Sequence, residues 1–163
     1  MSDIAKLKSE VLNYFKTYPQ WVNDFNIPRG YSFAEYSEFI KLVEESIPDG
    51  YSFANSEVYG TSIENGMIDV QQHNVSVDEH TDDVEPNAPF IMVVLSLDDL
   101  RPYPNSKFDT RPVFSYYDEM GKKNSVRLHE GDIITFKAHR PHSMIYYGDT
   151  YTVAMMQLKK NRK

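Results

Sequence analysis

Apolar residues near the start of the chain recur every three or four positions, which predicts two amphipathic helices. In the first helix Ser2 is the expected N-cap, and the apolar face is formed by Ile4, Leu7, Val11 and Phe15. In the second helix Ser32 and Glu35 have the spacing of a capping box, and the apolar face comprises Phe33, Tyr36, Ile40, Val43 and Ile47. The stretch 18–31 between them contains proline and glycine and is expected to be an irregular connection.

From residue 54 onward the pattern changes to short runs of β-branched and aromatic residues separated by turn sequences, which is typical of antiparallel sheets. Eight strands are expected, over residues 57–62, 67–72, 90–97, 113–117, 125–128, 132–137, 143–147 and 151–158. No repeat or long linker divides the chain, so we expect one domain over residues 1–163. Within it, residues 1–50 are a helical support that covers the outer face of one sheet, and residues 54–158 are the β core.

The composition narrows the class of protein and the chemistry available to it. With 163 residues, of which 40% are hydrophobic, the chain can bury the core of a single domain. The absence of cysteine excludes disulfides, zinc–thiolate sites and thiol nucleophiles. A net charge of −7 disfavours free nucleic acid as a partner, because that binding relies on a cationic surface. The chain shows no signal-like leader and no apolar run of roughly 20 residues, so the protein is expected to be cytoplasmic, with no membrane partner.

The segment DEHTDD, residues 78–83, places one histidine among four carboxylates. In an extended segment, side chains two residues apart project from the same face, so His80 and Asp82 can coordinate one metal ion together. A third ligand is available in His142, which follows Pro141 at the start of a predicted strand. Two imidazoles and one carboxylate on one side of a ferrous ion leave the opposite positions open, as in iron oxygenases. These residues alone leave a second interpretation open, in which the segment is a solvated acidic turn.

An ordered set of sequence patterns runs through the β core: MIDVQQHNVSVDEHTDD, APFIMVVLSLDD, RPVFSYYDE, VRLHEGDIITFKAHRPHSM and TYTVAMMQL. In order and spacing this set resembles the iron- and 2-oxoglutarate-dependent dioxygenase family, in particular its prolyl-4-hydroxylase-like branch, over residues 54–158. The resemblance implies a mainly β fold, the double-stranded β-helix, which is a jelly-roll or cupin-like barrel with the two N-terminal helices packed on one sheet. It also implies Fe(II) held by His80, Asp82 and His142 at one mouth of the barrel, 2-oxoglutarate as co-substrate, and hydroxylation of a protein or small-molecule substrate.

The chain departs from that family at the position that anchors 2-oxoglutarate. Family members usually place an arginine or lysine about nine or ten residues after the distal histidine, where this chain has no cation and the matching residues are Asp149, Thr150, Tyr151 and Thr152. A buried carboxylate without a cation loses a charge-assisted hydrogen bond of about 1.5–3 kcal/mol, so 2-oxoglutarate is expected to bind weakly unless another cation substitutes. The candidate substitutes, none of them at the motif position, are Arg111, Arg127 and Arg140. His73, seven residues before His80, offers three interpretations: a hydrogen bond to a ligand, an extra metal ligand or, the favoured one, a core histidine.

Two other functions remain open. A cupin-type metalloprotein uses a related barrel, and EGDIITFKAHRPH resembles the second cupin motif, but the first cupin motif requires HxH where this chain has HTD. Alternatively, a barrel without catalysis could bind a protein partner through its acidic rim, residues 78–85, and the loop 103–105. Motifs of serine hydrolases, phosphate-binding loops and zinc proteases are absent from the sequence.

Overall fold

The computed structural model describes residues 2–23, 29–53, 67–82, 89–98 and 109–161. Its elements are α1 (Asp3–Thr17), η1 (Pro19–Trp21), β1 (Arg29–Ser32), η2 (Phe33–Tyr36), α2 (Ser37–Glu44), β2 (Tyr51–Phe53), β3 (Met67–His73), β4 (Val77–His80), β5 (Phe90–Asp98), β6 (Val113–Tyr117), β7 (Lys123–Arg127), β8 (Ile133–Phe136), β9 (His142–Ile145) and β10 (Thr150–Lys160). Seven of the eight predicted strands are confirmed, as β3 and β5 to β10, to within two residues at either end. The predicted strand 57–62 lies outside the described residues.

Helix α1 forms as its sequence predicts. The Ser2 hydroxyl accepts a hydrogen bond from the Ala5 amide at 3.3 Å and so caps the first turn. The buried face of the helix consists of Leu7, Val11 and Phe15. These are three of the four residues that the spacing placed on the apolar face.

The second helix begins later than its sequence predicts. Ser32 is the last residue of β1, where it pairs with Met67, so its backbone belongs to a strand. The 3-10 helix η2 follows, and α2 begins at Ser37 without a side-chain cap. The α-helix is therefore predicted to start too early, whereas the Ser32 side chain lies outside the described part of the structure, so the capping box stays a prediction. The packed face of α2 is nevertheless apolar, with Phe39 and Val43 buried.

The strands form two antiparallel sheets. The larger has the order β1-β3-β10-β5-β8, with β2 paired to the end of β10, and the smaller has the order β4-β9-β6-β7. From the hairpin β6–β7 outward the pairs are nested, with β5 next to β8, β4 next to β9 and β3 next to β10. This is the pairing of one long hairpin folded over on itself, so that both halves contribute to both sheets.

Strands β1, β2 and β4 are the ones that the sequence pattern did not predict. The sequence of β4 is VDEH, and three of its four residues are exposed, so it lacks the apolar alternation that marks a half-buried strand. Pairing with β9, through Val77 with Met144 and His80 with His142, holds this segment in the smaller sheet.

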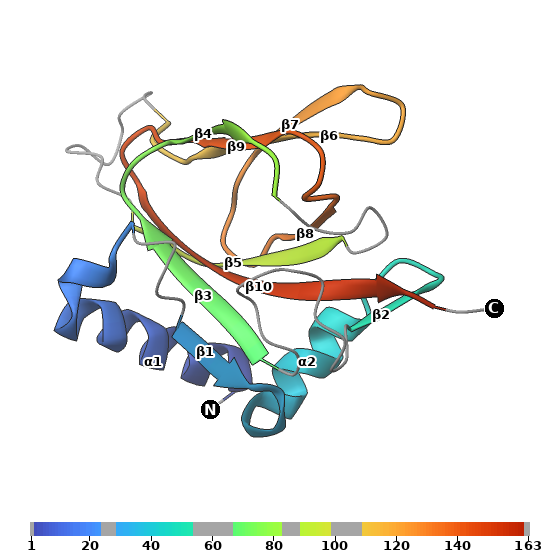
Figure 1. Cartoon of the computed structure of the whole chain (residues 1–163). Helices are drawn as coiled ribbons and strands as arrows, with labels where there is room; N and C mark the ends of the chain where they lie inside the picture. The colour runs from blue at the N-terminus through green and yellow to red at the C-terminus, as the bar shows by residue number, and fades with distance from the viewer. Residues whose placement is uncertain (1, 24–28, 54–66, 83–88, 99–108, 162–163) are drawn as a thin grey trace.

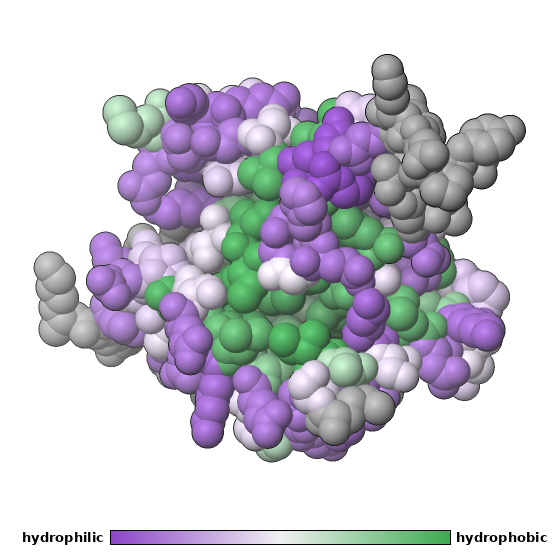
Figure 2. Space-filling view, turned by 180° about the vertical axis from the view of Figure 1, so that it is seen from behind, coloured by the Kyte–Doolittle hydropathy of each residue, from purple (hydrophilic) through white to green (hydrophobic). Residues whose placement is uncertain are grey.

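The two sheets and the helices form three layers, as Figure 1 shows: α1 and α2 on one face of the larger sheet, and the smaller sheet over the other. Side chains alternate along β5, where Ile91 and Val93 pack with the helices and Met92 and Val94 face the smaller sheet. We call this second cluster the inter-sheet core; its buried residues are Phe90, Met92, Val94, Phe114, Leu128, Phe136, Ala138, Met144, Tyr151 and Val153. Seen from behind, apolar residues gather across the middle of the molecule, between more polar surfaces above and below (Figure 2).

The predicted fold class is confirmed at the level of a mainly β chain whose two helices cover one sheet. Among the described residues no strand pairing joins the edges of the two sheets, so closure into a double-stranded β-helix stays a prediction. None of the helices in these residues is both long and apolar enough to cross a membrane.

Candidate metal centre

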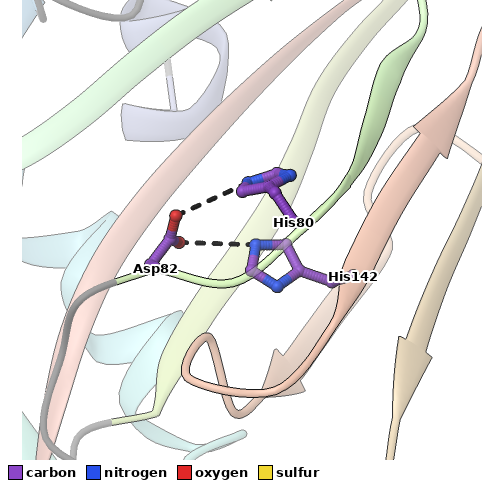
Figure 3. Close-up of side chains that lie close together, drawn as sticks. All are labelled: His80, Asp82 and His142. Carbon is purple, nitrogen blue, oxygen red and sulfur yellow. Dashed lines mark ion pairs between the residues drawn. The ribbon is translucent and has the colours of Figure 1, made fainter.

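Two histidines and one aspartate from distant parts of the chain meet at the smaller sheet (Figure 3). His80 is the last residue of β4 and His142 the first of β9, and the two are direct partners in the antiparallel register. Asp82 reaches both of them: its Oδ1 lies 3.5 Å from His80 Nε2, and its Oδ2 lies 3.4 Å from His142 Nε2. One ligand atom from each residue falls within 4.8 Å of the other two. The structure therefore brings together the three residues that the sequence singled out.

Backbone hydrogen bonds fix the segments that carry these ligands. The Asp82 amide donates to the Ala138 carbonyl at 2.8 Å, which ties the end of β4 to the turn between β8 and β9. From the neighbouring strand, the Tyr117 amide donates to the Pro141 carbonyl at 3.2 Å. The residue before His142 is thus held by β6, and its proline ring restricts the backbone further.

Both histidines are oriented by a carbonyl oxygen two residues before them in the chain. His80 Nδ1 lies 2.7 Å from the Asp78 carbonyl oxygen, and His142 Nδ1 lies 2.8 Å from the Arg140 carbonyl oxygen. Because a carbonyl oxygen only accepts, Nδ1 of each ring carries a proton and donates. Nε2 of each ring faces Asp82, and this tautomer-fixing hydrogen bond at Nδ1 is the arrangement of imidazoles that bind a metal through Nε2.

The centre is buried on one side and open on the other. The His142 side chain is 7% exposed, and its ring centroid lies 5.1 Å from that of Phe136 and 6.5 Å from that of Phe114. The side chains of His80 and Asp82 are 41% and 36% exposed. A ligand can therefore approach from solvent on one side and meet the inter-sheet core on the other.

The donor set fits a ferrous ion. Bonds of about 2.1 Å at right angles place neighbouring ligand atoms about 3 Å apart. The observed separations of 3.4 and 3.5 Å involve the two different oxygens of Asp82, and one ligand atom from each residue lies within 4.8 Å of the others. Side-chain rotation is therefore needed before one Asp82 oxygen and both Nε2 atoms surround a metal. Two neutral imidazoles and one carboxylate are also the ligand types found in mononuclear iron oxygenases.

Two of the three predicted substitute cations, Arg111 and Arg127, gather around Asp109. Arg111 donates to both carboxylate oxygens of Asp109, from Nη2 at 2.7 Å and from Nε at 3.0 and 3.2 Å. Its hydrogen bond and charge hold the pKa of that carboxyl below its usual range. Arg127 donates from Nη1 to the carbonyl oxygens of Arg111 and Asp109, at 2.9 and 3.3 Å, and its guanidinium lies 5.0 Å from the Tyr147 ring centroid. Both side chains have protein partners, and binding of a co-substrate by either stays a prediction.

Arg140 is the predicted cation closest in sequence to the metal ligands. Its Nε is buried and has no hydrogen-bond partner among the described residues. Nearby, Lys137 pairs with Glu119, and first Lys137 and then Arg140 lower the pKa of the Glu119 carboxyl. Arg140 thus belongs to a group of charges around the β8–β9 turn, and its binding of a co-substrate also stays a prediction.

His73 lies in the larger sheet, in a row of polar side chains along β3 in which Asp69 and His73 are buried and Gln71 is partly buried. Gln71 Nε2 donates to Asp69 Oδ2 at 3.3 Å, and His73 Nε2 lies 3.3 Å from Gln71 Oε1. We call Asp69, Gln71 and His73 the polar row. Asp69 and Gln71 belong to no recognised site motif, and the signal that marks them is their alternation with apolar residues in MIDVQQH. In a strand covered on both faces, polar residues at every second position mark a polar stripe in the interior.

Only part of the predicted acidic rim, residues 78–85, is described. Asp78 and Glu79 are exposed on β4, whereas residues 83–85 and the loop 103–105 lie outside the described residues. Binding of a protein partner there stays a prediction.

Comparisons with known proteins do not assign a family. No protein-family model and no curated protein matches the chain. Among solved structures, Peruvianin-I, a cysteine peptidase from Thevetia peruviana latex, is 13% identical, with a TM-score of 0.39 over 68% of this chain and 62% of the peptidase. An RmlC-like cupin protein from Desulfovibrio desulfuricans is 9% identical, with a TM-score of 0.31 over 57% of this chain and 70% of the cupin. FeII HppE is 10% identical, with a TM-score of 0.31 over 68% of this chain and 58% of HppE.

This chain therefore spans less than two thirds of the length of Peruvianin-I and of HppE. Such low identities and TM-scores are insufficient to assign a function.

Proposed function

We propose that this protein is an iron(II) oxygenase in which His80, Asp82 and His142 hold the metal. The observation that supports the proposal is the convergence of three ligand atoms within 4.8 Å, with both Nε2 atoms directed at one carboxylate. Ligands on one side of an iron ion leave positions for dioxygen and substrate on the other. Bound there, ferrous iron would supply dioxygen activation and oxidation of a substrate group.

The residues of the chain contribute position and protection. The Asp78 and Arg140 carbonyl oxygens orient the two imidazole rings, so that both Nε2 atoms already face Asp82 before a metal binds. The apolar wall beside His142, formed by Phe114 and Phe136, would keep water from that side of the centre. The exposed side, at His80 and Asp82, would admit the substrate.

The double-stranded β-helix is part of the proposal. Four nested antiparallel pairs, from β6–β7 to β3–β10, are the pairs that form when one long hairpin is rolled into the two facing sheets of a jelly roll. The inter-sheet core between these sheets supports the same interpretation.

The position that carries the cation in the resembled family does not supply one for 2-oxoglutarate in this chain. At the position where the resembled family carries its cation, the side chain facing the inter-sheet core is Tyr151, which is 1% exposed and donates its hydroxyl to the Val75 carbonyl at 2.8 Å. At the alternative position, the Thr152 hydroxyl accepts a hydrogen bond from the Gln72 side-chain amide at 2.9 Å. Neither residue offers the positive charge that a buried carboxylate needs.

Binding of nitric oxide, a stable analogue of dioxygen, tests the proposed function. Anaerobic addition of ferrous ion and nitric oxide to the wild type is expected to give the EPR signal of a ferrous–nitrosyl complex, because the proposed ligand set leaves coordination positions open. The His142→Ala variant is expected to lose the signal. An equal signal from both proteins, or none from the wild type loaded with iron, would count against the proposal.

Substitution of Tyr151 by arginine is expected to strengthen the binding of 2-oxoglutarate relative to the wild type. A guanidinium at this position restores a charge-assisted pair and should tighten binding by at least about tenfold. The measurement is anaerobic titration of the iron-loaded proteins with 2-oxoglutarate, followed by visible absorption. The control variant is Tyr151→Phe, which removes the hydroxyl group and keeps the aromatic ring. Tight binding by the wild type would show that another cation already takes this role.

A further inference from the structure

The polar row of β3 points into the space between the two sheets. The residues that alternate with it, Ile68 and Val70, pack against the helices, so Asp69, Gln71 and His73 face the opposite side. Their register partners on β10 are Met155, Val153 and Tyr151, which all belong to or pack on the inter-sheet core. Asp69 and His73 are only 3% and 2% exposed. The row is therefore a polar stripe inside the sandwich.

The polar row and the metal centre border the same space. β3 continues through a short turn into β4, the strand of the smaller sheet that ends at His80 (Figure 1). Phe136 and Phe114, which contact His142, belong to the inter-sheet core that also includes the β10 neighbours of the row. Stacked sheets lie about 10 Å apart, so the row and the metal centre face the same layer of side chains from opposite sheets.

One acceptor of the row is left without a donor. The Gln71 side-chain amide nitrogen donates a hydrogen bond to Asp69 Oδ2, and its carbonyl oxygen lies next to His73 Nε2. The other carboxyl oxygen of Asp69, Oδ1, receives no hydrogen bond from either residue. That atom is buried and has no hydrogen-bond partner among the described residues. The register neighbours of Asp69, Gly30 on β1 and Met155 on β10, have no side-chain donor to offer. A buried carboxyl oxygen without a partner is rare in folded proteins and calls for a ligand or water.

The charges around the row favour a cation. Burial raises the pKa of Asp69 to about 7, and no cationic side chain is among the causes that act on it. Burial also lowers the pKa of His73 to about 4, so this ring is neutral near pH 7 and adds no positive charge. A bound cation would supply both the missing donor and the missing charge.

We propose that Asp69 and Gln71 form a subsite that binds an ammonium group of the substrate, inside the sandwich and across from the metal centre. Asp69 accepts from the ammonium through Oδ1, and Gln71 holds the carboxyl group in place through Oδ2. The substrate is then an amine, and its carbon chain occupies the apolar space between the row and the metal centre. The role of the metal rests on the proposed function, whereas the subsite stands on the row itself.

Three probes with the same carbon chain and different head groups test this subsite: butylamine, butyramide and butyrate. Each is titrated into isotope-labelled protein and followed by NMR shifts, once without metal and once with zinc as a redox-inert substitute for iron. Butylammonium is expected to bind and to shift the Gln71 side-chain amide signals. The isosteric variant Asp69→Asn should weaken its binding by at least about tenfold, because the charge is lost and the size is kept. The matched control, Asp49→Asn, removes an exposed carboxylate and should leave binding unchanged.

Each outcome decides for or against the subsite. Equal binding by the wild type and Asp69→Asn, stronger binding of butyrate than of butylammonium, or no shift with any probe overturns it. Gln71→Met, which keeps the side-chain length, provides a second variant should Asp69→Asn fail to fold, and it is also expected to weaken binding. The metal-free titration separates the two proposals: butylammonium binding that depends on Asp69, in a protein that binds no ferrous ion, refutes the oxygenase and leaves the subsite.

Discussion

Replacing Asp82 with alanine is expected to weaken binding of ferrous ion by more than about 100-fold, a larger loss than outer hydrogen-bond partners of metal ligands typically cause. Asp82 is the only charged ligand of the three, and its two oxygens face the Nε2 atoms of His80 and His142 at 3.5 and 3.4 Å. Its removal takes away one bond to the metal and the charge that offsets the cation. The affinity is measured by anaerobic titration with ferrous ion in competition with a chelator of known strength.

Glu79→Ala is the matched control for this experiment. Glu79 is an exposed carboxylate of the same acidic segment but is not one of the three converging residues. It is expected to change the affinity less than about threefold, because an exposed charge contributes only a screened attraction. Equal losses in the two variants would mean that the segment attracts cations diffusely, as a solvated acidic turn does.

The second large effect concerns the polar row, whose two titratable groups are expected to give opposite dependences of stability on pH. The pKa of Asp69 is raised from 3.8 to about 7, so the folded state holds a proton that the unfolded state releases. Its contribution to the free energy of unfolding therefore falls as pH rises from about 4 to about 7, by about 4 kcal/mol in total. The pKa of His73 is lowered from 6.5 to about 4, so its contribution rises over almost the same range, by about 3 kcal/mol. In the wild type the two effects nearly cancel.

Single substitutions should separate these two effects. Asp69→Asn is expected to be more stable than the wild type at about pH 8 and to lose that advantage at about pH 4, because only the ionised carboxylate is penalised by burial. His73→Gln should gain stability relative to the wild type at about pH 4 and not at about pH 8. Urea unfolding at several pH values measures both differences. A constant difference between Asp69→Asn and the wild type over this range would mean that Asp69 titrates like an exposed carboxyl group.

Local sequence patterns were sufficient to predict most of the fold. The first helix was predicted from its three-to-four-residue apolar period, and seven strands from short apolar, β-branched or aromatic runs between turn residues, as in the continuous run FIMVVLSLD of β5. The start of α2 was predicted too early because a 3-10 helix, η2, forms over the first turn of the predicted helix, and local spacing does not distinguish a 3-10 turn from an α-helical one. β4 was missed because its exposed side chains carry no alternation, and its strand geometry comes from β9.

The same distinction holds for the candidate metal centre. His80 and Asp82 could be predicted as a pair because their spacing alone puts them on one face of an extended segment. Their contact with His142 depends on the pairing of β4 with β9, which local sequence does not reveal. Sequence position alone also did not show that Arg111 and Arg127 gather around Asp109, since long flexible side chains reach partners that spacing does not reveal. The buried face of β3 became visible only when the helices and the smaller sheet were placed on its two sides.

The most direct test of the account is a crystal structure of the protein grown anaerobically with ferrous ion, with anomalous data collected on both sides of the iron absorption edge. The account predicts one iron peak about 2.1 Å from Nε2 of His80, Nε2 of His142 and a carboxylate oxygen of Asp82. An iron peak elsewhere, or no peak at these three side chains at saturating iron, would contradict it.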